Sequence, residues 1–152
     1  SRGLGDVYKR QTIASENSIF GQNGPRVGSP AGGAIVAHSA NILGHKRARE
    51  MWMTCKRYSA TEMMNWGLVN SVVKKEKLDD EVKKYGDEIL KAAPTCLKIL
   101  KASFRKQFDE ILKITQKSMV EEVSPEYFKT GEQAEGAKAF LEKRKPNFKK
   151  FR

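Results

Sequence analysis

The sequence predicts a mostly helical α/β domain with one or two short strands. Three observations support this: a strand–turn–strand pattern near the start, a loop rich in glycine and proline, and a long series of amphipathic helices behind that loop. Two short strands cannot form a stable sheet by themselves. We therefore expect the rest of the sheet to lie upstream, and the chain to be the C-terminal half of a larger domain.

The composition is that of a soluble globular protein. The 152 residues are 39% hydrophobic and 31% charged, with 29 basic against 18 acidic residues and a net charge of +11. That charge favours anionic partners without choosing among them. No apolar run approaches the roughly 18 residues of a membrane helix, and no secretory signal is visible. We expect no membrane partner.

The cysteines and histidines give little sign of a special site. Cys55 and Cys96 stand outside any metal-binding motif, so we expect two reduced core thiols and a cytoplasmic protein. His38 and His45 lack a third ligand at a recognisable spacing, so we expect no metal.

The elements are expected in this order. The residues Ser1 to Gln11 resemble adapter sequence read as coding at the ends of metagenomic fragments, and we exclude residues 1–11 as non-native. Residues 12–20 read as a strand, a turn and a second strand. Residues 21–33 hold five glycines and two prolines, which excludes regular structure. We favour a structured pocket loop over a flexible connector, because an amphipathic helix (34–43) follows directly.

The remaining chain is predicted to be helical, apart from a strand at 68–73. A helix at 45–55 is followed by Ser59 and Glu62, which form a capping-box pattern. Further helices are expected from Lys77, from Pro94, at 111–120 and at 131–143. Three of these helices have apolar stripes that are expected to face the core. The stripe is Leu78, Val82, Tyr85, Ile89 and Leu90 in the helix from Lys77, and Leu97, Leu100, Phe104 and Phe108 in the helix from Pro94. In the helix 131–143 it is Ala134, Ala137, Phe140 and Leu141.

Four blocks in order resemble the crotonase (enoyl-CoA hydratase/isomerase) family. They are TIASENSIFGQNGPRVGS, the segment ILGHKRAREMWMTCKRYSATEMMNWGLVNSVV, the helix APTCLKILKASF and the terminal EGAKAFLEKRKPNF. The resemblance implies a ClpP/crotonase-like β-β-α spiral. Residues 12–74 would be the end of the spiral core, with the pocket loop at 21–33, and residues 75–152 a helical trimerisation region. It also implies an acyl-CoA substrate and a homotrimer or hexamer.

Within the family, the pocket loop looks most similar to naphthoate synthase (1,4-dihydroxy-2-naphthoyl-CoA synthase) and 2-ketocyclohexanecarboxyl-CoA hydrolase. Plain hydratases have a Pro-Glu pair where Asn23 and Gly24 stand here. The resemblance thus favours carbon–carbon bond formation or cleavage beside a CoA thioester. However, Ala31, Val36 and Phe128 stand where the synthases have an aspartate, a serine and a tyrosine. Either the substrate differs, or bicarbonate or another side chain moves the proton, or the enzyme is weak or inactive.

The family reaction passes through an enolate held by two backbone N–H groups. In the family both donors lie upstream of the segments matched here, so we expect this chain alone to be inactive. No covalently bound cofactor is expected, and coenzyme A enters as part of the substrate. Candidate residues fall into three groups: for catalysis Ser29 and His38; for substrate binding Asn23, Gly24, Pro25, Val27, Pro30 and Ala31; for CoA binding Tyr127, Phe128 and Lys143.

Each candidate residue has a plainer alternative. Ser29 could bond within its own loop, His38 could be a core or surface histidine, and the aromatic pair could be packing residues. Lys143 could be a solvated lysine. For the whole protein, a generic hydratase or isomerase is one alternative and a basic module that binds nucleic acid is another. The second is disfavoured because aromatic residues are not interleaved with the basic ones.

Overall fold

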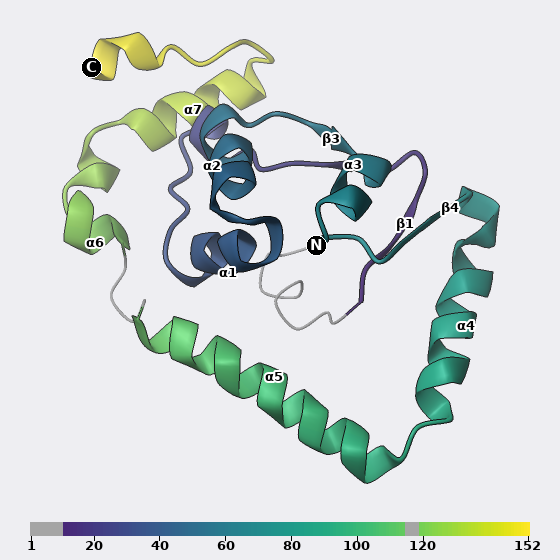
Figure 1. Ribbon diagram of the computed structural model, residues 1–152. Coiled ribbons are helices and arrows are strands. Elements are labelled where there is room, and N and C mark those ends of the chain that lie inside the picture. The colour runs from purple at the N-terminus through teal and green to yellow at the C-terminus, as the bar shows by residue number, and fades with distance from the viewer. Residues whose placement is uncertain (1–10, 115–118) are drawn as a thin grey trace. The chain divides into compact units, whose positions relative to one another are not determined.

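The computed structural model describes residues 11–114 and 119–152 (Figure 1). The expected adapter segment lies, except for Gln11, outside the described residues. The chain divides into two compact units, one made of residues 1–20 and 57–110 and the other of residues 21–56 and 111–152. Within the described ranges, no helix is long and apolar enough to span a membrane.

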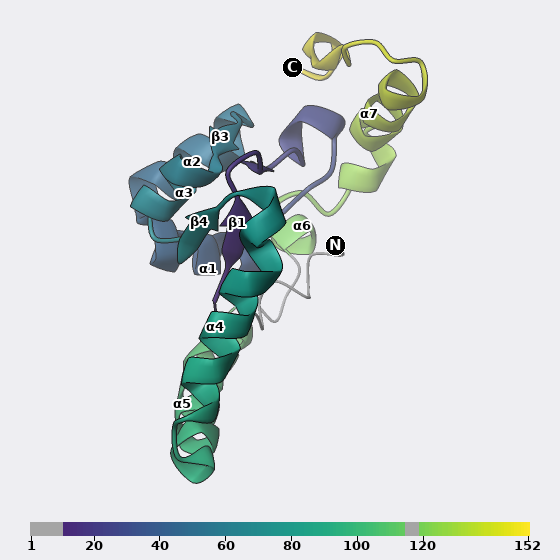
Figure 2. The same cartoon turned by 90° about the vertical axis from the view of Figure 1, so that its right-hand side faces the viewer.

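The first unit holds two small sheets. Strand β1 (Ile13–Ser15) pairs in parallel with β4 (Ser71–Val73), and β2 (Ile19–Phe20) pairs antiparallel with β3 (Tyr58–Ser59). Figure 2 shows β1 and β4 side by side. The described part of the chain has four short strands: three lie in the segments read as strands, 12–20 and 68–73, and β3 is additional. The two N-terminal strands also pair with distant partners and not with each other, because the turn between them leads β2 into a second sheet.

Helix α3 (Ala60–Asn65) begins at the predicted capping box. The Ser59 hydroxyl accepts from the Glu62 amide at 3.2 Å, and the Glu62 carboxylate accepts from the Ser59 amide at 2.7 Å. These two bonds satisfy amides that a helix start otherwise leaves without partners. Ala60 and Met63 are fully buried, and Tyr58 meets Trp66 with ring centroids 4.7 Å apart. These residues form the core of the first unit.

Helix α4 (Leu78–Leu90) follows the 3-10 helix η3 (Lys75–Lys77) and lies against β1. The hydroxyl of Ser71 donates to the carboxylate of Glu81 at 2.8 Å, which ties β4 to this helix. The predicted apolar stripe of α4 is not core in this chain, since Val82, Ile89 and Leu90 are exposed.

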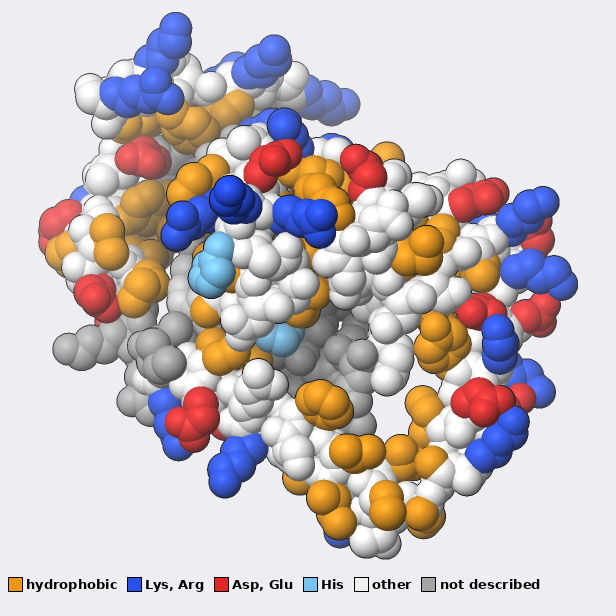
Figure 3. All heavy atoms as spheres, viewed as in Figure 1, with side chains coloured by type: hydrophobic (Ala, Val, Ile, Leu, Met, Phe, Trp, Pro, Cys, Tyr) orange, Lys and Arg blue, Asp and Glu red, His pale blue; other side chains and the backbone are white. Residues whose placement is uncertain are grey.

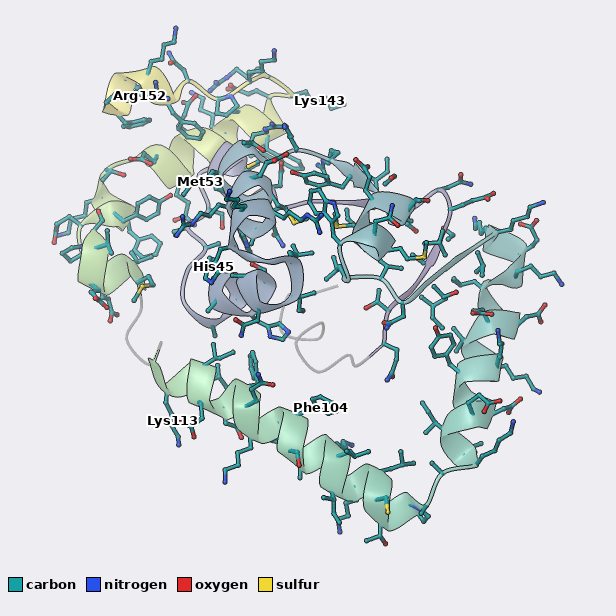
Figure 4. The ribbon with its side chains drawn as sticks, viewed as in Figure 1. His45, Met53, Phe104, Lys113, Lys143 and Arg152 are labelled. Atoms are coloured by element: carbon teal, nitrogen blue, oxygen red, sulfur yellow. The ribbon has the colours of Figure 1, made fainter. Side chains whose placement is uncertain are left out.

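Helix α5 (Pro94–Ile114) is a single helix. The prediction that a separate helix begins at Ile111 is therefore wrong, because Ile111 lies within α5. Residues 115–118 of that predicted helix lie outside the described residues. The α5 stripe, expected to be core, is not buried either: Leu100 and Phe104 are 54% and 66% exposed, and Leu97 and Phe108 are half-buried. Ile99, outside the predicted stripe, is 61% exposed. Hydrophobic side chains gather along this helix in the space-filling view (Figure 3), and Phe104 projects from it in Figure 4.

The second unit begins with a helix pair. Helices α1 (Ala34–Leu43) and α2 (His45–Thr54) match their predicted ranges closely and pack against each other. Ala48, Met51 and Trp52 are buried, as is Cys55. The other cysteine, Cys96, is exposed, so the expectation of two core thiols holds for only one of them.

The C-terminal part of this unit is a series of short elements. They are α6 (Met119–Val123), the 3-10 helix η4 (Tyr127–Lys129), α7 (Glu132–Leu141) and the 3-10 helix η5 (Phe148–Phe151). On α7 the predicted inward face is wrong: Ala134, Ala137, Phe140 and Leu141 are exposed. The buried residues are Glu135, Gly136 and Ala139 instead. Backbone of η2 (Pro25–Val27) packs on Gly136, and a cluster of cations gathers at Glu135, so this face points inward despite its polarity.

Candidate functional site

The glycine-proline loop is structured, as expected. Pro25 opens η2, where its fixed φ suits the first helical position. The amides of Val27 and Ser29 both donate to the Gly24 carbonyl, at 3.0 Å and 2.9 Å. Gly28 ends the turn with φ +63°, a conformation that favours glycine. The backbone between Gly24 and Ser29 thus forms a closed turn, which we call the pocket turn.

An apolar cavity of about 590 Å³ lies beside the pocket turn, within the second unit. Volumes of this order suit small-molecule ligands. Its wall combines the end of the loop and the start of α1 with residues from the C-terminal elements. The lining residues are Pro30, Ala31, Gly32, Gly33, Ala34, Ile35, Leu112, Met119, Val120, Val123, Ser124 and Tyr127.

The predicted substrate-binding residues divide into two groups. Pro30 and Ala31 line the cavity directly. Asn23, Gly24, Pro25 and Val27 form the pocket turn and the residue before it, outside the described lining. They support the wall through the backbone.

The two predicted catalytic residues also lie outside that lining. Ser29 is exposed, and its backbone amide closes the pocket turn. His38 is half-buried in α1, and this burial lowers the pKa of its imidazole.

Of the residues predicted to bind CoA, only Tyr127 lines the cavity. Its hydroxyl donates to the Gly28 carbonyl at 2.5 Å, a contact spanning 99 positions of sequence. Phe128 is 65% exposed and meets the Tyr127 ring edge-on, with centroids 5.4 Å apart. Lys143 is exposed and follows α7, in the same C-terminal segment as Arg152 (Figure 4).

Sequence reasoning missed the helical part of the wall. Leu112, Met119, Val120, Val123 and Ser124 all line the cavity, yet nothing in their pattern distinguishes them from ordinary packing residues. The spacing of Met119, Val120 and Val123 is that of one helical face. This spacing could not indicate that the face borders a cavity, and none of the three side chains is buried: Val123 is exposed.

A buried carboxylate holds the C-terminal segment on α7. Glu135, 7% exposed, accepts from Arg144 at 2.7 Å, from the Asn147 amide at 2.8 Å and from Lys150 at 3.1 Å. The Arg144 hydrogen bond, followed by the Asn147 and Lys150 bonds, lowers the pKa of this carboxyl to about 2. Charge and hydrogen bonds both favour the ionised form, so the cluster is fully satisfied at neutral pH.

Comparison with known proteins places almost the whole chain in one family. Residues 11–151 match the model of the enoyl-CoA hydratase/isomerase family.

Solved structures share the fold. An enoyl-CoA hydratase from Mycobacterium avium subsp. paratuberculosis K-10 is 28% identical with a TM-score of 0.76, over 96% of this chain and 60% of that one. A methylmalonyl-CoA decarboxylase in complex with 2-nitronate-propionyl-CoA is 24% identical with a TM-score of 0.75, over 93% of this chain and 55% of that one. A carnitinyl-CoA dehydratase from Mycobacterium avium 104 is 22% identical with a TM-score of 0.71, over 95% of this chain and 57% of that one. The chain thus spans between 55% and 60% of the length of these structures.

Proposed function

Because the chain belongs to the enoyl-CoA hydratase/isomerase family, and its neighbours confirm the expected crotonase fold, we propose that it forms the acyl-binding part of an enzyme acting on acyl-CoA thioesters. The single observation that carries the proposal is the apolar cavity beside the pocket turn. Its wall includes Pro30, Ala31 and the apolar side chains of α6, groups that suit a hydrocarbon chain better than water.

The proposed chemistry stabilises an enolate. Two preorganised N–H donors would bind the thioester oxygen, and in the family these donors come from segments preceding those matched here. The cavity would hold the acyl group while that oxygen is bound elsewhere. We expect the 152-residue chain alone to bind an acyl-CoA without turning it over.

For the reaction itself we propose carbon–carbon bond formation or cleavage, rather than hydration. Hydration in the resembling enzymes uses a glutamate where Gly24 stands here. A Cβ at Gly24 would lie 2.8 Å from the Ser29 carbonyl oxygen, closer than side chains approach backbone. The pocket turn therefore has no room for a glutamate in its present conformation. A generic hydratase or isomerase that places its acid–base group elsewhere is the second candidate.

Ala31 lines the cavity where the resembling synthases have an aspartate. Bicarbonate in place of that carboxylate stays a prediction. The described lining offers two hydroxyls, from Ser124 and Tyr127, and no cation to hold an anion, so we derive no step through it.

Self-association is proposed as well, as a trimer or hexamer in a cytoplasmic protein. The exposed apolar side chains Ile99, Leu100 and Phe104 on α5 support it, because they would leave water on contact with a second copy.

The binding experiment is titration calorimetry of the chain with free CoA, butyryl-CoA and octanoyl-CoA. Affinity should rise with acyl length, because each buried methylene contributes about 0.8 kcal/mol. Ala31→Trp should fill the cavity and remove this dependence, whereas Ala92→Trp, outside the lining on an exposed turn, should not. Equal affinity for all three ligands would refute an acyl pocket.

The reaction is tested on a longer protein that includes the upstream donor segments. It should act on a cyclic keto-acyl-CoA and hydrate crotonyl-CoA slowly. Fast hydration of crotonyl-CoA would favour the generic hydratase instead.

A further inference from the structure

The pocket turn is held from outside by the segment that begins with η4. The Tyr127 hydroxyl donates to the carbonyl of Gly28, the residue that ends the turn. The turn also lies against α7. A Cβ at Gly28 would come within 2.5 Å of the Glu132 carbonyl oxygen, and a Cβ at Gly136 would overlap the Val27 carbonyl. Backbone packing thus limits the turn at α7, and two described side-chain hydrogen bonds hold it: Tyr127 on the Gly28 carbonyl, and Arg26 of the turn on the Thr54 carbonyl at 3.1 Å.

Tyr127 is also part of the cavity wall. Its ring lines the same space as Pro30 and Ala31, which directly follow the pocket turn. A shift of the Gly28 carbonyl would therefore move two lining residues. The hydroxyl proton of Tyr127 is engaged with Gly28, so this group is poorly suited to donate a proton to a ligand. Burial, with a contribution from Glu132, raises the pKa of Tyr127, which keeps the phenol in the neutral form that can donate.

We propose that Tyr127 is a positioning residue: its hydroxyl fixes the pocket turn and so sets the shape of the cavity wall at Pro30 and Ala31. This inference deepens the acyl-CoA proposal and rests on it for the identity of the ligand. It gives Tyr127 a different role from the CoA contact expected from the sequence. The residue acts through Gly28, and its ring serves as wall.

The test compares Tyr127→Phe with the wild-type chain by amide hydrogen exchange. The variant keeps the ring and loses only the donor. Amides of Val27 and Ser29, which close the turn, should exchange about fivefold faster, as expected when a net hydrogen-bond contribution of about 1 kcal/mol is lost. Amides of α1 and α2, in the same unit, should keep their rates. Tyr85→Phe on α4 is the matched control and should change neither set.

Uniform acceleration across the second unit would show a general loss of stability and overturn the proposal, as would unchanged exchange at Val27 and Ser29. If Tyr127→Phe fails to fold, Ser29 exchange in Gly136→Ala gives a second measurement. In that variant the new methyl group on α7 pushes against the Val27 carbonyl and so displaces the pocket turn. Unchanged exchange of the Ser29 amide would then also contradict the proposal that contacts with the C-terminal segment hold the turn.

Octanoyl-CoA titration then links the turn to the cavity. Binding should be about fivefold weaker in Tyr127→Phe, if the same net loss of one hydrogen bond is transmitted to the wall. Free CoA binding should be unchanged. Equal octanoyl-CoA binding by both proteins would overturn the link to the wall. Suppose that the wild-type chain binds no acyl-CoA, but that Val27 and Ser29 still exchange faster in Tyr127→Phe than in wild type. This result would contradict the proposed function alone and would support the role of Tyr127 in the turn.

Discussion

The indole N–H of Trp52 donates to the Ser39 hydroxyl over 2.8 Å, and this bond joins α2 to α1. Trp52 is buried, so its donor has little access to water once the acceptor is removed. Ser39 in turn donates to the Val36 carbonyl at 2.7 Å, which fixes the direction of its hydroxyl.

Ser39→Ala should therefore destabilise the protein by about 1–3 kcal/mol, the usual result of leaving a buried donor without a partner. Urea denaturation measures the change. Ser103→Ala is the matched control: its hydroxyl bonds to the Ile99 carbonyl on an exposed helix, and we expect a change within about 0.5 kcal/mol. Equal effects of the two substitutions would contradict the role given to the Trp52 bond.

Two helical glycines should respond in opposite directions to alanine. Gly136→Ala should destabilise by about 1–3 kcal/mol, because its methyl group would overlap the Val27 carbonyl. Gly86→Ala meets nothing within 4 Å and should stabilise by about 0.5–1 kcal/mol through helix propensity. Chemical denaturation of both variants checks the pair. A stabilising Gly136→Ala would mean that α7 and the pocket turn are not in close contact.

Acid should weaken the cluster at Glu135. The pKa of this carboxyl is about 2 in the folded chain against an ordinary 4.5, so its contribution is complete above pH 4.5 and is lost as the pH falls toward 2. Glu135→Gln should be less stable than wild type at pH 7, and the difference should shrink below pH 4.5. Urea midpoints between pH 7 and pH 3 provide the measurement. Glu126→Gln, which removes an exposed pair with Lys129, should give a much smaller difference. A gap for Glu135→Gln that stays constant with pH would show that the charge is not involved.

Gly24→Glu should fail to create a hydratase. The Ser29 carbonyl oxygen occupies the space beside position 24, so the new side chain must distort the pocket turn. We expect no gain in crotonyl-CoA hydration by the longer protein, and weaker octanoyl-CoA binding by this chain. Steady-state assays and calorimetry check the two expectations. A variant that hydrates crotonyl-CoA faster than wild type would show that the turn can accommodate the acid.

Phe104→Glu should reduce self-association. Phe104 is 66% exposed on α5, beside Leu100, so a charge there would be buried in any interface that uses this face. Sedimentation velocity should show a shift toward monomer. Lys106→Glu, on the same helix but outside the apolar stripe, is the control for a change of charge alone. An unchanged distribution for Phe104→Glu would exclude this face from the interface.

Local signals in the sequence predicted local structure well. The capping box at Ser59 and Glu62 and the helix 34–43 appear as expected, because both depend on residues within one or two turns. The pairing of β1 with β4 could not be predicted in the same way. It depends on a register between segments more than 50 positions apart, which no local pattern encodes.

The face of α7 shows a second kind of limit. Hydrophobicity alone indicated that Phe140 and Leu141 would be inside, yet Glu135 and Gly136 are. The buried glycine is explained by close backbone contact with Val27, and the buried glutamate by Arg144 and Lys150. The first reason depends on a partner far away in the sequence, and the second on partners 9 and 15 positions further along the chain, beyond the end of the helix, which helical periodicity does not indicate. The candidate site divides likewise: the loop was predicted from its glycines, whereas the hydroxyl of Tyr127 on Gly28 required the structure.

The parallel register of β1 and β4 also has a consequence for synthesis. Ile13 pairs with Ser71 and Ser15 with Val73, so the partner strand is translated 58 residues later (71 − 13). At a translation rate of about 5–20 residues per second, the edge of the first strand stays unpaired for several seconds. During that interval its backbone is open to other nascent chains, and we expect yield in a heterologous host to improve when a weak promoter keeps such chains dilute.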